Sequence, residues 1–511
     1  MVQESRKKKK ERKKERNMNI KERKMYIPEQ HLQPILEQDP TKSCKNCCEF
    51  YWTKSGIIYR DHTRVYNNQT LPLLYKKNMS QEFLQLLEGL RSAVNTTRKA
   101  AEANYDNLRS SNPDQAVTLT ANVVCNPAFP LEARIFACVL FRRMVRPTAC
   151  FTKMSNTTKQ HEIRSSLLTL LTLDDSSTPK TLRRSIVHAV ASLATTCDLN
   201  VSDLSKSWPE LLQTVSGLAG TTNTQTYHRE SGHDLLRRLI EALPESLLVH
   251  KATISPLMAT GLSDSSQDVQ LAALQGCSQF LTLLNNEPDR NLFLPLVPSL
   301  MNTLSSILSN GNELGARDAL ESLVAVAEAQ PTFWRTHLTL VWNAMCTVSG
   351  HTDLEPETRT MAIELLLAIC ELAGGMVRKH PQLLIQFTTV VMNVLCEVED
   401  VDVTEWSSAE ENEATYGDSM EEDEIGNIAE QAMDRLATSI GGKSMTPIVL
   451  PLATQFVNDT SNWRKRRAGL ETLALCAAGC GKSFEPVLGE LVKASIQYAQ
   501  DEHVRVRYSG K

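Results

Sequence analysis

The sequence predicts an all-α protein, a right-handed α-solenoid of about ten antiparallel helix pairs. Of the 511 residues, 41% are hydrophobic but only 5% are aromatic, so the core is built mainly from Leu, Ile, Val and Ala, a composition that favours helix over strand. One helical pattern also recurs at a nearly constant spacing from Met79 onward. Hairpin signals are absent, because the Asn310-Gly311 dipeptide lies between two helical stretches instead of two alternating runs.

The recurring unit is a helix, a turn with Asp, Asn or Pro, and a second helix that opens with an arginine or another polar residue. The openings are Arg98, Arg134, Arg183, Arg229, Gln270, Arg317, Arg359, Glu430, Arg467 and Arg507. Successive openings are separated by 36, 49, 46, 41, 47, 42, 71, 37 and 40 residues. All but the 71-residue step lie near the roughly 40–47 residues of HEAT or armadillo repeats. We therefore expect HEAT repeats.

The segment from Val269 to Phe280 illustrates why such a unit needs neighbours. Its apolar and small residues fall at 269, 272, 273, 276, 277 and 280, which is the stripe of an amphipathic helix. Small residues within the stripe, such as Gly276 and Cys277, allow close helix packing, and residues 263–265 can cap the helix N-terminus. One helix pair cannot bury this face alone, so the pairs are expected to stack.

The chain divides into five expected segments. These are a basic leader rich in Cys and aromatic residues (1–78), the first repeats (79–147), further repeats (148–396), an acidic insertion (397–424) and the last repeats, truncated at the C-terminus (425–511). The leader lacks apolar periodicity, so we expect it to be disordered or not native, and dispensable. A nuclear-localisation or nucleic-acid-binding patch is the alternative interpretation of its Lys/Arg run.

The acidic insertion is the strongest charge feature. Residues 397–424 carry 13 Asp/Glu and no Lys or Arg, whereas the chain as a whole has a net charge of −4 and residues 1–24 carry a net +8. The insertion falls inside the 71-residue step, which exceeds a normal repeat by about 30 residues. Because it contains Trp406 and Tyr416 among the acids, we expect it to contact a basic partner. A solvated loop is the alternative.

Motifs that suggest enzymatic chemistry are weak. GCGKS at 479–483 has Cys476 where a phosphate-binding loop needs its first Gly, and its glycines are interpreted as a helix C-cap. GGKS at 441–444 fails in the same way. A zinc site needs a second cysteine pair, and none follows Cys44, Cys47 and Cys48, although His62 lies nearby. The histidines His188 and His233 belong to no catalytic grouping. We expect no enzyme activity, cofactor or metal.

The chain is expected to be soluble and intracellular. No secretory signal is visible, and the most apolar stretch, Met361 to Val377, is interrupted by Glu364 and Glu371. The 13 cysteines are an odd number, and several lie singly in apolar helical patterns as free thiols. These are Cys138, Cys197, Cys277, Cys370 and Cys476.

A series of motifs resembles the importin-β (karyopherin-β) family over about residues 79–511. MSQEFLQLLEGLRSAVNTTRKAAEANYDNL resembles the family's N-terminal segment, and PLEARIFACVLFRRMV resembles the next repeat. The series continues with MVRKHPQLL, the acidic insertion, IAEQAMDRLATSIGGK, NWRKRRAGLETLA and DEHVRVRY. The leader has no counterpart, and family members are about twice as long. We therefore expect an N-terminal portion whose last helices fray from about residue 485.

The resemblance implies a nuclear transport receptor that shuttles between cytoplasm and nucleus. It would bind cargo, the GTP form of the GTPase Ran, and Phe-Gly nucleoporins, with basic cargo such as ribosomal proteins or histones, and without membrane insertion or direct nucleic-acid binding. The residues expected to contact Ran or basic cargo are Arg98, Arg134, Glu405, Trp406, Asp418, Glu421, Glu422, Asp423 and Glu424. The alternative is a HEAT-repeat scaffold outside transport.

Overall fold

The computed structural model describes residues 77–146, 150–173, 175–196, 203–398 and 424–510. Within these ranges the regular structure is entirely helical. Residues 1–76 of the predicted leader, with its cysteines, and the centre of the acidic insertion lie outside the described residues, whereas residues 77 and 78 already belong to the first helix.

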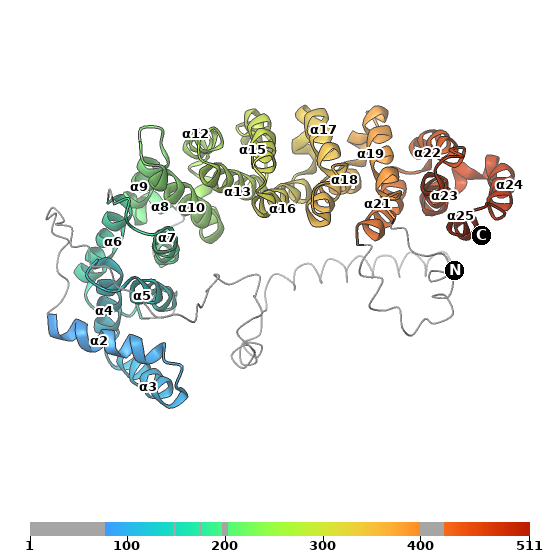
Figure 1. Cartoon of the computed structure of the whole chain (residues 1–511). Helices are drawn as coiled ribbons and strands as arrows, with labels where there is room; N and C mark the ends of the chain where they lie inside the picture. The colour runs from blue at the N-terminus through green and yellow to red at the C-terminus, as the bar shows by residue number, and fades with distance from the viewer. Residues whose placement is uncertain (1–76, 147–149, 174, 197–202, 399–423, 511) are drawn as a thin grey trace, which may run out of the picture. The chain divides into compact units, whose positions relative to one another are not determined.

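Ten helix pairs follow one another along the chain (Figure 1). They are α2 (Lys77–Leu90) with α3 (Asn95–Ser111), α4 (Pro113–Cys125) with α5 (Leu131–Met144), α6 (Thr157–Thr172) with α7 (Lys180–Ala194), α9 (Pro209–Ala219) with α10 (Thr226–Ala242), α12 (Lys251–Leu262) with α13 (Gln267–Leu283), α15 (Val297–Ser309) with α16 (Glu313–Ala329), α17 (Leu338–Ser349) with α18 (Pro356–Val377), α19 (Pro381–Val394) with α21 (Glu424–Ile440), α22 (Gly442–Val457) with α23 (Trp463–Phe484), and α24 (Leu488–Tyr498) with α25 (Val504–Ser509). Short helical elements precede some of these pairs. They are the helices α8 (Leu204–Ser207), α11 (Pro244–Leu248) and α14 (Glu287–Asn291) and the 3-10 turns η3 (Leu294–Leu296), η4 (Pro331–His337) and η6 (Glu485–Val487). The prediction of an all-α array of about ten pairs is confirmed.

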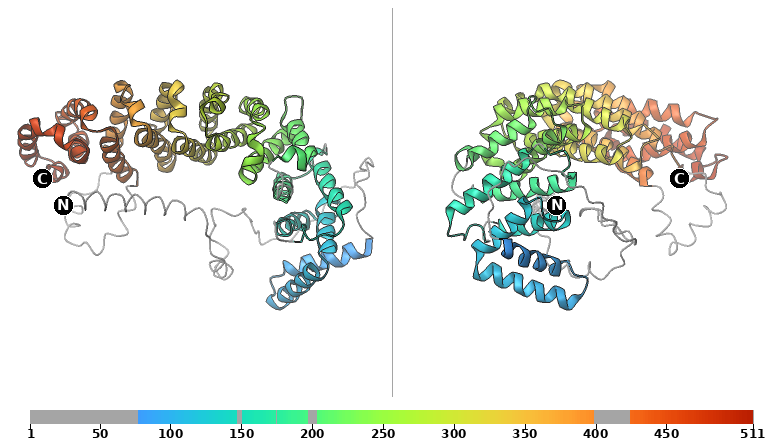
Figure 2. Two further views of the ribbon diagram at one scale, coloured as in Figure 1. Left: turned by 180° about the vertical axis from the view of Figure 1, so that it is seen from behind. Right: turned by 60° about the vertical axis from the view of Figure 1, so that its left-hand side comes forward.

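Two rows of helices build the array (Figures 1 and 2). The first helices of successive pairs touch one another from α4 through α22, and the second helices do so from α5 through α25. Each of the ten predicted openings lies in the second helix of a pair. The period in the sequence therefore reports the step from one pair to the next, because each amphipathic helix is buried by its neighbours on both sides.

The main core is an apolar cluster that runs from Phe83 to Phe484, and a small second cluster contains Val457, Leu470 and Val506. The main core consists mainly of Leu, Val, Ile and Ala, and its largest buried side chains include Trp334 and Trp342. The Trp342 indole nitrogen donates a hydrogen bond of 2.7 Å to the carbonyl oxygen of Leu383, which satisfies its polar atom inside the core. The thiols of Cys138, Cys277, Cys370 and Cys476 are free and buried, as predicted.

The glycines of GCGKS have a different role from the one the sequence suggests. They lie inside α23 and not at a helix end. A Cβ on Gly479 would lie 2.4 Å from the carbonyl carbon of Ala437, so α21 and α23 meet backbone to backbone here. The interpretation as a C-cap is therefore wrong for this segment: Gly479 permits a helix crossing. Gly441, with φ +83°, instead separates α21 from α22.

Two described segments, Glu287–Ser309 and Pro356–Val377, are long and apolar enough to cross a membrane. Their most apolar stretches are 44% and 67% buried within the protein. The second segment is α18, which contacts α16, α17 and α21. Its apolar side chains thus serve the packing between helix pairs.

Candidate functional site

Arginines near the start of second helices join neighbouring pairs. Arg229 binds Asp264 through two nitrogens at 2.6 and 3.1 Å, and it also donates to the carbonyl oxygens of its own turn. Arg466 binds Asp501 in the same way at 2.8 and 3.0 Å. Two-pronged bonds between arginine and carboxylate are strong and directional. Arg229, one of the predicted openings, and Arg466, the neighbour of the opening Arg467, therefore each fix one pair against the next.

One predicted contact residue, Arg134, has a structural role inside its own helix pair. Arg134 is buried in α5, and its Nε donates a hydrogen bond of 3.0 Å to the carbonyl oxygen of Val124 at the end of α4. Burial also lowers the pKa of Arg134. Its Nε is thus occupied inside the array, and little of the residue is exposed. Arg98 differs, because its side chain is one-third exposed and, among the described residues, bonds within α3, to Asn95 and Glu102.

The acidic contact residues are placed only in part. Six of them lie outside the described residues, namely Glu405, Trp406, Asp418, Glu421, Glu422 and Asp423. The helix α21 begins at the next one, Glu424. The first two residues of the expected insertion belong to the packed array. Glu397 binds Arg359, and the carbonyl oxygen of the buried Val398 accepts a hydrogen bond of 3.0 Å from Arg464.

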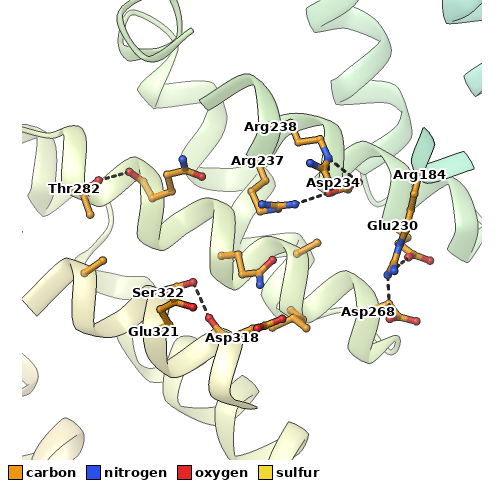
Figure 3. A pocket seen from close by; sticks show the side chains of 15 residues that line it. Arg184, Glu230, Asp234, Arg237, Arg238, Asp268, Thr282, Asp318, Glu321 and Ser322 are labelled. Carbon is orange, nitrogen blue, oxygen red and sulfur yellow. Dashed lines mark hydrogen bonds and ion pairs between the residues drawn. The ribbon is translucent and has the colours of Figure 1, made fainter. Parts of the chain in front are cut away.

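The second helices α7, α10, α13 and α16 enclose a groove of about 640 Å³ (Figure 3), which we call the second-helix groove. Its lining residues are Arg184, Glu230, Asp234, Arg237, Arg238, Asp268, Leu271, Ala272, Gln275, Gln279, Thr282, Asp318, Glu321, Ser322 and Ala325. Nearly all are polar, although they lie on helices whose other faces form the core. The sequence carries a signal for this groove, since pairs such as Gln275 and Gln279 share one helix face.

The α10 side of the second-helix groove carries excess positive charge. Asp234 accepts from Arg237 at 3.0 Å and from Arg238 at 3.1 Å, so two guanidiniums share one carboxylate. Burial, together with the nearby charge of Arg238, lowers the pKa of His188 to about 4, although Asp234 opposes this shift. His188 is therefore neutral at pH 7 and adds no charge.

At one end of the second-helix groove an ion-pair network spans three second helices. Lys180 of α7 contacts Glu230 of α10 at 3.0 Å and Asp268 of α13 at 2.6 Å. Arg184 also contacts Glu230, at 3.2 Å. Two cations and two carboxylates balance, so this end is neutral. Because the network joins α7 to α13 across α10, it restrains three helix pairs together.

The α16 side is acidic and unpaired. Asp318 and Glu321 are exposed, and neither carboxylate has an ion-pair partner in the described part of the chain. The side-chain amides of Gln275 and Gln279 on α13 lie between the two sides of the groove. Opposite charge on two walls, with amides between them, suits recognition of a polar protein segment. Among the described residues no group of His, Cys, Asp and Glu is arranged to hold a metal ion.

Comparisons with known proteins agree with this architecture. The family profile described as "IPO5-like, TPR repeats" matches residues 178–344, and the "Importin repeat" profile matches residues 351–447. Together the two profiles cover just over half of the chain.

Individual relatives match a longer stretch. The chain is 25% identical over 426 residues to the probable importin-5 homolog of Dictyostelium discoideum, covering 83% of this chain and 38% of that protein. It is 26% identical over 453 residues to importin subunit beta-3 of Saccharomyces cerevisiae, covering 84% and 39%. The crystal structure of Kap121p superposes with a TM-score of 0.73 at 24% identity, covering 85% of this chain and 40% of that one.

The chain thus spans about two fifths of the length of the relatives it matches. The helix-pair array, the two profiles and the relatives agree, and the HEAT-repeat assignment is confirmed with them. The chain belongs to the importin-β (karyopherin-β) family, within which it matches importin-5 and importin subunit beta-3.

Proposed function

We propose that this protein is a nuclear transport receptor that binds cargo proteins, Ran-GTP and Phe-Gly nucleoporins, carries protein into the nucleus and shuttles between the two compartments. The observation that supports this most is membership of the importin-β family. Kap121p, 25% identical to this chain, has been crystallised with RanGTP. Further Kap121p complexes contain Nup53p and Pho4p.

For cargo, we propose contact at the second-helix groove. Asp318 and Glu321 are exposed carboxylates without ion-pair partners in the described part of the chain, so a Lys or Arg side chain of a cargo protein can pair with them without displacing a contact seen there. The acidic insertion adds negative charge and raises the local concentration of basic proteins such as ribosomal proteins or histones, an effect that weakens as salt rises.

For Ran, we propose contact through α3, where Arg98 is accessible, and through the insertion residues Asp418, Glu421, Glu422, Asp423 and Glu424. The decisive experiment measures binding of the full chain to Ran loaded with a non-hydrolysable GTP analogue and to Ran-GDP. We expect at least tenfold tighter binding of the GTP form. Equal affinity for both forms contradicts the proposal and favours the alternative, a HEAT-repeat scaffold outside transport.

A matched pair of variants separates the insertion from general charge effects. Charge reversal at Glu421 and Glu422 is expected to weaken binding of the Ran GTP form several-fold at low salt. Reversal at Glu485 and Glu490, two exposed acids near α24, is the control and should leave affinity unchanged. A loss of the same size in both variants indicates a non-specific field effect.

A further inference from the structure

A second groove, of about 550 Å³, lies among first helices and is separate from the second-helix groove. We call it the first-helix groove. It is formed by α6, α8 and the start of α9, and the residues that matter for its chemistry are His161, Arg164, Ser165, Lys206, Trp208 and Glu210. Neither the cargo contact nor the Ran contact proposed above uses it.

Arg164 is held in this groove by aromatic rings. Its guanidinium carbon lies 5.7 Å from the centre of the Phe151 ring and 5.6 Å from the centre of the Trp208 ring, and both rings are buried. Cation–π contacts at this range fix the guanidinium in position. Its Nε is buried and has no hydrogen-bond acceptor among the described residues.

Arg164 also lacks a carboxylate partner in the described part of the chain, unlike the arginines that join helix pairs. Arg229, for example, is neutralised by Asp264 at 2.6 Å. Rings hold the position of a cation but leave its charge and its outward N–H groups available. The first-helix groove therefore contains a positioned guanidinium whose charge is unsatisfied.

Three further features favour an anion beside Arg164. Lys206 lines the groove with a largely exposed side chain, and its ion pair to Asp203 spans 3.4 Å. The N-terminus of α9 opens at the groove, but its first residue, Pro209, has no N–H, and the N–H of Leu211 already donates to the Trp208 carbonyl oxygen at 3.1 Å. The N–H of Glu210 has no acceptor among the described residues, and it carries the partial positive charge of a helix N-terminus. The Ser165 hydroxyl is exposed on the same wall and adds a donor.

We propose that the first-helix groove binds the phosphate of a phosphorylated Ser or Thr in a protein partner. A phosphate offers the acceptor oxygens that a guanidinium, an ammonium and a helix N–H group jointly satisfy. Glu210 lines the same groove and Asp203 pairs with Lys206, so their negative charge disfavours an extended polyanion such as RNA or an anionic membrane. The proposal stands independently of the transport function.

Calorimetry on the full chain tests this site. The probe is a blocked pentapeptide, Gly-Leu-phosphoSer-Leu-Gly, compared with its unphosphorylated form and with inorganic phosphate. We expect the phosphopeptide to bind at least tenfold more tightly than the unphosphorylated peptide, with affinity that falls as salt rises. Arg164→Gln should weaken binding on the order of tenfold to a hundredfold, and Lys206→Gln by a few-fold.

Control variants keep the test sharp. Arg335→Gln removes an exposed arginine of η4, far along the chain, and should leave binding unchanged. Arg164→Lys keeps a cation and should bind the phosphopeptide more tightly than Arg164→Gln, which distinguishes loss of charge from loss of folding. Lys206→Gln changes an exposed side chain and preserves the fold. Equal binding of both peptides, no binding at millimolar phosphopeptide, or full affinity in Arg164→Gln overturns the proposal. Arg164-dependent binding to vesicles with 20% phosphatidylserine, without phosphopeptide binding, overturns it in favour of a membrane ligand.

Discussion

Arg359 and Glu397 are 38 residues apart in the sequence and form two parallel ion-pair hydrogen bonds of 2.6 Å each. Arg359 also donates from Nε to the carbonyl oxygen of Ser349 at 2.9 Å, so one buried side chain holds the end of α17, the start of α18 and the segment after α19. The first residue of the expected acidic insertion is therefore a structural residue of the array. The charge available to partners begins after it.

Removing Glu397 should destabilise this part of the array. Glu397→Ala leaves the Arg359 guanidinium buried without a carboxylate, which we expect to cost about 2–3 kcal/mol. Thermal unfolding followed by circular dichroism should show a melting temperature lower by several degrees. Glu355→Ala is the control: Glu355 is exposed and pairs with Arg317 at 3.4 Å, so its loss should cost less than about 1 kcal/mol. Equal shifts in the two variants contradict the structural role of Glu397.

Two glycines of α23 should respond oppositely to alanine. Gly479→Ala places a Cβ against the Ala437 backbone, which forces α21 and α23 apart and should destabilise by roughly 1–3 kcal/mol. Gly481→Ala meets nothing within 4 Å and should stabilise by up to about 1 kcal/mol through helix propensity. Denaturant midpoints of both variants check this. Stabilisation by both would show that the helices do not meet at Gly479.

His233 should make the fold sensitive to mild acid. The side chain is buried, and neither ring nitrogen has a hydrogen-bond partner among the described residues. Burial lowers the pKa of His233 from 6.5 to about 4, and the opposing effects of Asp264 and the Ala219 backbone offset only part of this shift. Between pH 6.5 and 4 the unfolded chain binds a proton that the folded chain does not. Stability is therefore complete above pH 6.5 and falls as the pH drops, by up to about 1.4 kcal/mol per pH unit.

The melting temperature measured from pH 7 to pH 4.5 tests this. His233→Gln removes the titrating group and should flatten the decline, even if it lowers the starting value. His351→Gln, at an exposed position, is the control and should keep the slope of the parent protein. An unchanged slope in His233→Gln would show that other groups govern the acid response.

Charge reversal in the second-helix groove should weaken binding of basic peptides. Asp318→Lys with Glu321→Lys replaces the unpaired acids of α16, and we expect roughly tenfold weaker binding of a Lys/Arg-rich peptide at low salt. Fluorescence anisotropy with the full chain measures this. Glu485→Lys with Glu490→Lys is the control of equal charge change. Indistinguishable affinities for the two double variants contradict a cargo contact at this groove.

The tenth helix pair should exchange backbone hydrogens quickly. Leu488, Val492 and Ile496 share one face of α24 and are 54%, 49% and 61% exposed, so few apolar contacts hold that helix. We expect amides of 486–511 to exchange far faster than those of 360–375 in α18. Hydrogen exchange with mass spectrometry on the monomer gives the result. Similar protection in both segments would show that α24 is held by contacts beyond these.

The number and order of the helix pairs were predictable from the sequence because amphipathic spacing is a local property of each helix. Spacing also predicts the acidic insertion, since an insertion lengthens one step between second helices and leaves the others unchanged. The family followed from motifs that are local as well. Even the free, buried state of cysteines such as Cys277 followed from their apolar surroundings in a single helix.

Only the tertiary structure decided which polar residues are available to partners. Arg98 and Arg134 occupy similar places near the start of second helices, yet one is accessible and the other is buried against the Val124 carbonyl. Whether Gly479 ends a helix or lets two helices touch, and whether Asp318 has a partner, also depends on contacts between residues one or two repeats apart. Those contacts are set by the angle and distance at which neighbouring helices pack, and helical periodicity within one segment does not encode either quantity.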